Sequence, residues 1–280
     1  MFKNISEVLL EAKDLGISLL DAEILLANVL KTSKEQIFAY PEKEVFLEDY
    51  LKFKSFIKKR LDGFSVAAIL KEKEFYGFDF YVSKNCLIPR PETEILVEKA
   101  LECIIILQNN KKNVKILDIG TGSGCIPVVI AMKSDYSEFL AVDKSRKALK
   151  EAKKNIVRYD LESRIYLKES DLLKNVGDFD FDIITANLPY LPEKQMLDES
   201  VVKEPKMALI GGKDGMKFYG KLFKQISELN PKPKYLILEF GYGQAELVKR
   251  AVNKYFIDFY MELYDDLAGI PRISVIEFFN

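Results

Sequence analysis

The chain has no histidine and no tryptophan among its 280 residues. A mechanism that needs an imidazole base or a histidine metal ligand is therefore excluded, which removes Ser-His-Asp hydrolases and most catalytic zinc chemistry. Cysteine is also scarce. Cys86, Cys103 and Cys125 lack the spacing of a zinc site and are too few for a disulfide framework. This usage fits a reducing compartment, and we expect a cytoplasmic protein.

An excess of one charge and long apolar runs are absent as well. The 42 basic and 43 acidic residues give a net charge of −1, so no overall positive field attracts nucleic acid, and we expect no direct nucleic-acid partner. Met1 to Leu10 has no signal-peptide core, and the run Cys103 to Leu107 is far too short to span a bilayer, so we expect no membrane role. The composition predicts a globular, soluble protein. We expect it to be a monomer.

The first 70 residues are predicted to be helical. One stripe lies behind a cap at Ser18 or Asp21, and a second stripe leaves a basic outer face that is either solvated or meets a partner. The apolar positions are Ala22, Leu25, Leu26, Val29 and Leu30 in the first stripe and Tyr50, Phe53, Phe56, Ile57 and Leu61 in the second; the basic positions are Lys54, Lys58, Lys59 and Arg60. Residues 74–83 alternate aromatic side chains around Gly77 and predict a β-hairpin. We expect a helical domain at 1–70, a hairpin linker at 71–90 and a second domain at 91–280.

A helix is predicted from about Glu92 to Leu107, and beyond it short β-rich runs alternate with helical stretches. The runs are Val114–Ile119, Phe139–Val142, Arg164–Leu167, Phe181–Ala186, Tyr235–Phe240, Phe256–Met261 and Arg272–Phe278. Such alternation is typical of a parallel sheet covered by helices on both faces. The last two runs leave little room for a crossover, so we expect an antiparallel pair at the end.

The first of these runs leads into the glycine-rich turn Gly120-Thr121-Gly122-Ser123-Gly124. Glycines permit positive φ and let the backbone approach a ligand at a helix N-terminus. Cys125 stands where the dinucleotide fingerprint requires its third glycine, so the spacing disfavours a dinucleotide. Two carboxylates follow later strands. Asp143 could accept the hydroxyls of a ribose, and Asp171, which precedes Leu172, could accept the exocyclic amine of an adenine.

The glycine-rich turn followed by the two carboxylates resembles the class I methyltransferases. In that class the glycine turn wraps the methionine portion of S-adenosylmethionine. The resemblance implies a Rossmann-like α/β domain with a seven-stranded, mostly parallel sheet. It also implies that Asp118 lies near the amino group of the cofactor; its alternative role is to cap the turn. The predicted cofactor site comprises Asp118, Gly120, Thr121, Gly122, Ser123, Gly124, Asp143, Asp171, Leu172 and Asn187.

The most specific feature is Asn187-Leu188-Pro189-Tyr190, directly after the fourth strand of the second domain. It resembles the (Asn/Asp)-Pro-Pro-(Tyr/Phe) loop of methyltransferases that modify planar nitrogens. Such nitrogens are weak nucleophiles because their lone pair is delocalised. Two acceptors, the Asn187 side-chain oxygen and the Leu188 carbonyl, could hold both N–H groups and favour charge development on nitrogen. All four residues are predicted to be catalytic and to bind the substrate.

This loop departs from the family pattern by having Leu188 where proline is usual. The carbonyl is retained, and Pro189 still biases residue 188 toward extended backbone. Leucine adds an N–H group and some freedom to the loop. Tyr190 could offer a face to a flat amide or base, or it could be a core residue.

Three further blocks resemble the release factor glutamine methyltransferase family, and the resemblance covers nearly the whole chain. They are Leu87–Glu94, Glu204-Pro205 with Ala208–Gly215, and Asp266–Arg272. The family implies methyl transfer from S-adenosylmethionine to the glutamine N5 of a Gly-Gly-Gln motif in class-1 peptide chain release factors. Arg90 and Glu92 could order a lid over the cofactor or contact the peptide; alternatively, Arg90 and Glu94 form a structural ion pair.

Three other functions stay open on the sequence. No motif named above decisively separates a glutamine methyltransferase that acts on a ribosomal protein from one that acts on a release factor. An adenine-N6 DNA or RNA methyltransferase shares the tetrapeptide, but the neutral charge argues against it. A non-catalytic cofactor-binding module would have no need of Asn187 and Pro189.

Overall fold

The computed structural model describes residues 3–109, 111, 113–177, 180–196 and 198–279. In these ranges no helix combines the length and the apolar character needed to cross a membrane. The chain divides into two compact units, one made of Met1–Glu72 with Leu197–Lys203 and the other of Lys73–Met196 with Glu204–Asn280.

The first unit is helical. Its elements are β1 (Lys3–Asn4), α1 (Ile5–Asp14), α2 (Leu19–Leu30), α3 (Lys34–Ala39), β2 (Glu44–Val45), α4 (Leu47–Leu61), α5 (Val66–Leu70) and α9 (Glu199–Val202). Ser18 caps α2 by accepting the N–H of Asp21, which decides between the two predicted caps. The apolar stripes of α2 and α4 meet in one core, where Phe53 is buried among the α2 leucines. Arg60 was expected on the outer face of α4, but it pairs with Asp21 of α2 and is only partly exposed.

A hairpin of β3 (Glu72–Phe75) and β4 (Phe78–Tyr81) follows, two residues earlier than predicted. Its turn residues, Tyr76 and Gly77, both have positive φ, as a tight two-residue hairpin turn with the right twist requires. Residues 82–92, called the β4–α6 segment below, then run without regular secondary structure to α6 (Thr93–Gln108).

A seven-stranded sheet forms the centre of the second unit. Its strands are β5 (Val114–Ile119), β6 (Ser137–Asp143), β7 (Ile165–Glu169), β8 (Ile183–Asn187), β9 (Tyr235–Glu239), β10 (Phe259–Asp265) and β11 (Pro271–Phe278), in the order β10-β11-β9-β8-β5-β6-β7. The five strands β9, β8, β5, β6 and β7 are parallel to one another. β11 runs antiparallel to both of its neighbours, β9 and β10. The predicted mostly parallel sheet and its antiparallel end are confirmed.

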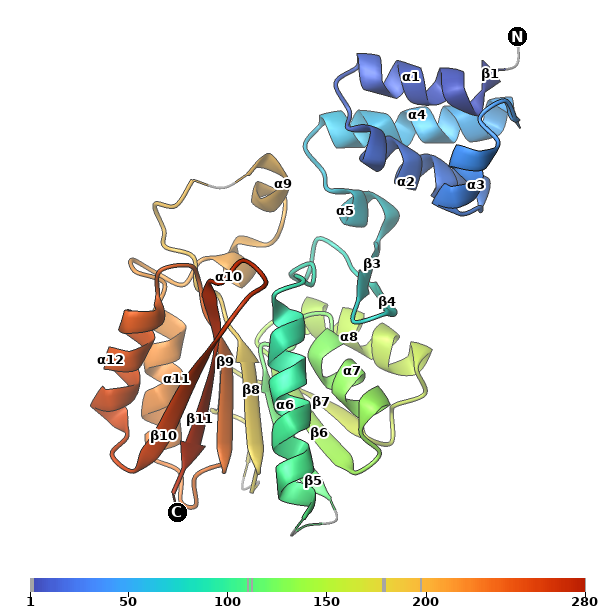
Figure 1. Cartoon of the computed structure of the whole chain (residues 1–280). Coiled ribbons are helices and arrows are strands. Elements are labelled where there is room, and N and C mark those ends of the chain that lie inside the picture. Colours follow the sequence, from blue (N-terminus) through green and yellow to red (C-terminus); the bar gives the residue numbers. More distant parts are fainter. Residues whose placement is uncertain (1–2, 110, 112, 178–179, 197, 280) are drawn as a thin grey trace. The chain divides into compact units, whose positions relative to one another are not determined.

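Helices cover both faces of this sheet (Figure 1). They are α6, α7 (Cys125–Lys133) and α8 (Arg146–Arg158) on one face and α11 (Lys217–Ser227) and α12 (Ala245–Tyr255) on the other; α10 (Lys206–Leu209) is a single turn. Successive strand residues point to opposite faces, so Ile116 joins the core under α6 and α7 while Leu117 joins the core under α11. The short, mostly apolar runs that form the parallel strands reflect this burial on both sides.

One strand prediction was misplaced. The run Phe256–Met261 was expected as a strand, but β10 begins at Phe259 and extends to Asp265. Phe256 instead ends α12 and packs its ring edge-on against Phe278, with the centroids 4.8 Å apart. Its apolar character serves the core under α11 and α12.

Candidate active site

A cavity of about 250 Å³ lies at the carboxyl edge of the parallel strands, between the ends of β5, β6, β7 and β8. The order of the strands reverses between β5 and β8, which is the place where open α/β sheets bind ligands. Its lining residues are Asn85, Cys86, Leu87, Pro89, Arg90, Thr93, Ile119–Ser123, Cys125, Ile126, Asp143–Ser145, Ala148, Ser170–Leu172, Asn187–Pro189, Met207, Ala208 and Phe218.

The glycine turn forms one wall. Gly120, Gly122 and Gly124 all have positive φ, which explains why this loop contains glycine at alternate positions. Gly124 is also the N-cap of α7 and lies against α8, where an added Cβ would come within 3.1 Å of the Ala152 Cβ. Gly124 therefore allows two helices to approach and does not line the cavity.

Asp143 and Asp171 both line the cavity, on the carboxyl side of β6 and β7. The Asp143 carboxylate accepts the N–H groups of Gly122 at 3.0 Å and Ser145 at 2.7 Å, which fixes its plane beside the turn. Burial raises its pKa, and these two bonds oppose the shift. The ammonium of Lys221, 2.7 Å from Asp171, lowers the pKa of that carboxyl. Leu172, the next residue, has positive φ.

Asp118 is buried within the sheet and is absent from the cavity lining. Its Oδ1 accepts the hydroxyl of Thr185 at 2.8 Å, and its Oδ2 has no hydrogen-bond partner in the described part of the chain. Burial raises the pKa of Asp118 to about 6. The hydroxyls of Thr121 and Thr185 oppose this shift, and of these two residues Thr121 lines the cavity.

Asn187 ends β8 next to Glu239, which ends β9; the two are register partners. The Asn187 Nδ2 donates to Glu239 Oε2 at 2.7 Å and to Thr93 Oγ1 at 3.1 Å. Both amide hydrogens are thereby used within the protein. The Asn187 Oδ1 has no partner among the described residues, although it is buried, and Asn187 lines the cavity. The structure therefore provides a free acceptor at the position where the sequence predicted one.

Leu188 is held more firmly than the sequence suggested. Its N–H donates to the hydroxyl of Tyr219 at 3.2 Å, and its side chain is 3% exposed. The expected gain in loop freedom is therefore absent. Tyr190 does not line the cavity: its hydroxyl donates to Glu239 Oε1 at 3.1 Å, and its carbonyl accepts from Gln244 at 2.7 Å.

The block Ala208–Gly215 lies against this loop. A Cβ on Gly211 would come within 2.3 Å of the Pro189 carbonyl oxygen, and one on Gly215 within 2.0 Å of the Tyr190 carbonyl oxygen. Only glycine allows such close contact between two backbones. This block therefore shapes the back of the Asn187 loop.

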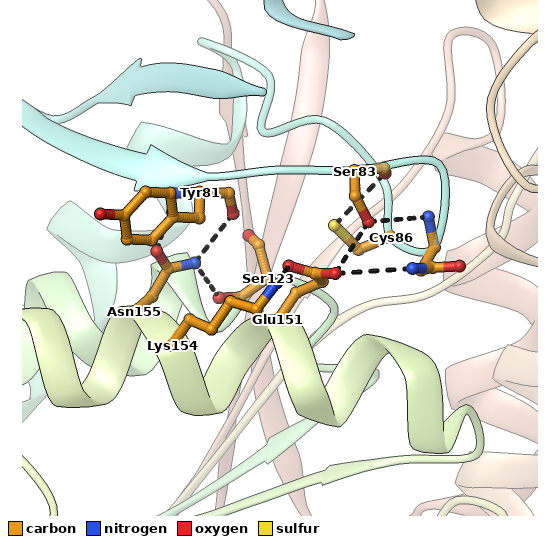
Figure 2. A network of polar contacts seen from close by, with 8 residues as sticks. Tyr81, Ser83, Cys86, Ser123, Glu151, Lys154 and Asn155 are labelled. Atoms are coloured by element: carbon orange, nitrogen blue, oxygen red, sulfur yellow. Dashed lines mark hydrogen bonds and ion pairs between the residues drawn. The ribbon is translucent and has the colours of Figure 1, made fainter. Parts of the chain in front are cut away.

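The β4–α6 segment forms the opposite wall, and α8 holds it (Figure 2). Asn155 of α8 accepts the N–H of Tyr81 at 2.7 Å and donates to the carbonyls of Tyr81 and Ser123, at 3.0 and 2.8 Å. Glu151, one turn earlier, accepts from Ser83 at 3.0 Å. One helix thus fixes the β4–α6 segment and the glycine turn relative to each other.

Arg90 lines the cavity and pairs with Glu204, whose other oxygen accepts the N–H of Ile88 at 3.0 Å. The alternative pairing of Arg90 with Glu94 is wrong, because Glu94 accepts the N–H of Tyr76 instead. Glu92 lies at the N-cap of α6 and does not line the cavity.

Two cysteines line the cavity, and burial disfavours the thiolate form of both. Burial raises the pKa of Cys86 to about 11 and that of Cys125 to about 12, so both stay protonated at neutral pH. The described residues include no group of three or more cysteine, aspartate or glutamate side chains suited to a metal ion.

Family models match both parts of the chain. Residues 97–248 match the model described as "Methyltransferase small domain", and residues 3–70 match "PrmC N-terminal domain". The protein of Coxiella burnetii named "Release factor glutamine methyltransferase" is 35% identical over 260 residues, covering 91% of this chain and 90% of that protein. A protein of Koribacter versatilis with the same name is 35% identical over 274 residues, covering 95% and 93%.

The chain belongs to the release factor glutamine methyltransferase family. This membership and the methyltransferase fold imply the use of S-adenosylmethionine. Solved structures are similar at the level of the fold. The catalytic domain of hMettl16 in complex with a MAT2A 3′UTR hairpin has a TM-score of 0.58 at 13% identity, covering 85% of this chain and 84% of that one. The human methyltransferase 10 domain containing protein has a TM-score of 0.51 at 18% identity, covering 70% and 86%.

Sequence reasoning missed several residues that shape the site of this methyltransferase. They are Thr93, Glu151, Asn155 and Glu239. Glu239 offered a signal, since it is the one charged residue in the apolar run Tyr235–Phe240 and lies at its carboxyl end. Glu151 and Asn155 of α8 offered no such signal, because a helix commonly carries polar residues on a solvated face.

Proposed function

We propose that this protein transfers a methyl group from S-adenosylmethionine to the side-chain amide nitrogen, N5, of the glutamine in the Gly-Gly-Gln motif of a class-1 peptide chain release factor. The observation that carries the proposal is the free, buried Oδ1 of Asn187 at the cavity wall. The names of the relatives support the substrate.

The cavity fits the cofactor. Asp143 would accept the ribose hydroxyls, since each of its oxygens keeps a lone pair beyond the backbone bond it accepts. The turn Gly120–Ser123 would surround the methionine portion, with Asp118 Oδ2 as a buried acceptor behind it. Asp171 and Leu172 would hold the adenine. When bound, the sulfonium supplies an activated methyl group.

The residues of the Asn187 loop would hold the acceptor amide. The Asn187 Oδ1 accepts one N–H of the glutamine and the Leu188 carbonyl accepts the other, which orients the nitrogen and favours positive charge on it. The hydroxyl of Tyr219 lies 3.2 Å from that carbonyl and also donates to the carbonyl of Glu239. The Tyr219 hydroxyl has a single hydrogen to share between these two carbonyls. The Leu188 carbonyl therefore keeps a lone pair for the substrate amide. No histidine base is needed, because an alkylated amide nitrogen is strongly acidic.

We assign the parts of the chain accordingly. Residues 1–70 would bind the release factor, 71–90 would be the linker, and 91–280 would carry the chemistry. Arg90 would border the peptide, since it lines the cavity while paired with Glu204. The free, buried cysteines support a reducing cytoplasm as the place of action, and we expect the enzyme to act as a monomer.

The test offers the enzyme labelled S-adenosylmethionine with four acceptors: a release factor, its Gly-Gly-Ala variant, a ribosomal protein fraction, and DNA or RNA. Label on the release factor that is lost in the Gly-Gly-Ala variant is the expected result. Label on the ribosomal fraction alone would identify a ribosomal-protein glutamine methyltransferase, and label on nucleic acid alone an adenine methyltransferase. An enzyme that binds S-adenosylmethionine but labels none of the four would be a binding module.

A further inference from the structure

Glu239 is a buried carboxylate that neither the cofactor site nor the acceptor site uses directly. It is 1% exposed and does not line the cavity. No lysine or arginine of the described residues pairs with it. An unpaired buried carboxylate is expensive, so its surroundings must explain its place in the sheet.

Three hydrogen-bond donors surround it. Oε2 accepts the hydroxyl of Thr93 at 2.6 Å and the Nδ2 of Asn187 at 2.7 Å, while Oε1 accepts the hydroxyl of Tyr190 at 3.1 Å. The side chains of Asn187 and Glu239 are on the same sheet face, and Thr93, the first residue of α6, covers them there. Two of these three donors, Asn187 and Tyr190, belong to the Asn187 loop. The carboxylate thus anchors this loop.

The contact with Asn187 sets which end of its amide meets the cavity. An ionised carboxylate can only accept hydrogen bonds, so the nitrogen of Asn187 must face Glu239 and the oxygen must face outward. A flipped amide would place two oxygens against each other and present a donor to the substrate nitrogen. Such a donor could not hold an NH₂ group.

The same contact also changes the strength of the acceptor. Donation by Nδ2 to a carboxylate polarises the amide and makes its oxygen a better acceptor. A negative charge behind Asn187 further favours the positive charge that develops on the methylated nitrogen.

We propose that Glu239 is a positioning residue for methyl transfer, which holds Asn187 so that its Oδ1 accepts from the substrate amide. This inference rests on the proposed function for its catalytic readout. Burial raises the pKa of Glu239 to about 7, opposed by the bonds from Thr93, Tyr190 and Asn187. The acidic neighbour Glu92 of α6 raises this pKa further, while Arg90 and Arg272 lie near Tyr190.

The test compares Glu239→Gln and Glu239→Ala with the exposed control Glu246→Gln at pH 8. We expect kcat to fall about tenfold in Glu239→Gln, which keeps one acceptor oxygen, and about 100-fold in Glu239→Ala. KM for the cofactor should change little in both, and the control should match the wild type. The wild-type kcat should rise with pH through about 7, and the Glu239→Gln profile should be flat in this range.

A purely structural role would give lower melting temperatures with unchanged kcat per folded enzyme and an unaltered pH profile, and this result would overturn the inference. A second readout does not depend on the substrate. In protein labelled with ¹⁵N-asparagine, the Asn187 side-chain NH₂ should be protected from exchange in the wild type and lose protection in Glu239→Ala. Unchanged protection would also overturn the inference. A wild type that labels no release factor would instead refute the proposed function, leaving the exchange data to decide the role of Glu239.

Discussion

A Cβ atom on Gly120 would lie 3.1 Å from Cδ2 of Leu188, so the glycine turn and the Asn187 loop leave no room between them for a side chain at this position. Gly120 also has a φ of +75°, and alanine there would be strained by about 1–2 kcal/mol. We expect Gly120→Ala to lower stability in urea unfolding and to lower kcat, because Leu188 must move. Gly269 has a φ of +74° with nothing within 4 Å, so Gly269→Ala is the matched control for strain alone. Equal kcat in both variants would show that Leu188 adapts without moving the loop.

Asn187 and Asp143 should give opposite kinetic signatures. Asn187→Ala removes a contact made to the acceptor nitrogen, so kcat should fall at least about 100-fold with cofactor affinity nearly intact. Asp143→Ala should weaken cofactor binding first, by about tenfold or more in calorimetry. Loss of cofactor affinity in the first variant, or unchanged affinity in the second, would contradict these roles.

Leu188→Pro restores the proline that is usual at this position. It keeps the carbonyl but removes the N–H that donates to Tyr219 and part of a buried side chain. We expect a loss of about 2 kcal/mol in unfolding free energy, with kcat retained within about threefold. Leu188→Ala keeps the N–H and loses only packing, so it separates the packing loss from the loss of the N–H together with the fixed φ of proline. A collapse of kcat in Leu188→Pro alone would show that the N–H matters to catalysis.

Asn155→Leu should weaken cofactor binding from a position outside the cavity lining. The change leaves two groups of Tyr81 and the Ser123 carbonyl without their partner, which should cost about 3 kcal/mol of stability. The Michaelis constant for the cofactor should rise because both walls of the cavity lose their common support. Asn253→Leu on the exposed face of α12 is the control, since the Asn253 side chain bonds to the carbonyl of Lys249 in its own helix and to no other described residue. A Michaelis constant equal to that of the control would refute this role for Asn155.

The titration of Glu239 should lower the free energy of unfolding as the pH rises toward neutrality. Burial raises its pKa from 4.5 to about 7, so between these values the folded state holds a proton that the unfolded state has lost. The folded state then binds more protons, and raising the pH removes that advantage, by up to about 3 kcal/mol. Glu239→Gln should flatten this decline between pH 4.5 and 7 relative to the wild type, measured by urea unfolding at each pH. An unchanged slope would show that Glu239 titrates normally.

The sequence predicted those parts of the site whose structure depends on residues close together in the chain. The glycine turn, the strand ends at Asp143 and Asn187, and the sheet with its antiparallel end follow from periodicity and spacing over a few residues. Glu239 could not be assigned this way, because its partner Asn187 lies 52 residues away and only the register of β8 and β9 joins them. Arg90 illustrates the same limit. The sequence offered the nearby Glu94 as its partner, whereas the fold brings Glu204 from 114 residues away.

The path of the chain restricts how this protein can be divided. The segment carrying α9 follows the Asn187 loop in sequence yet belongs to the helical unit, and the chain returns to the methyltransferase unit at Glu204, the partner of Arg90. A cut after residue 72 would therefore separate α9 from the rest of its compact unit. An exchange of the complete helical unit between relatives would have to carry both pieces together.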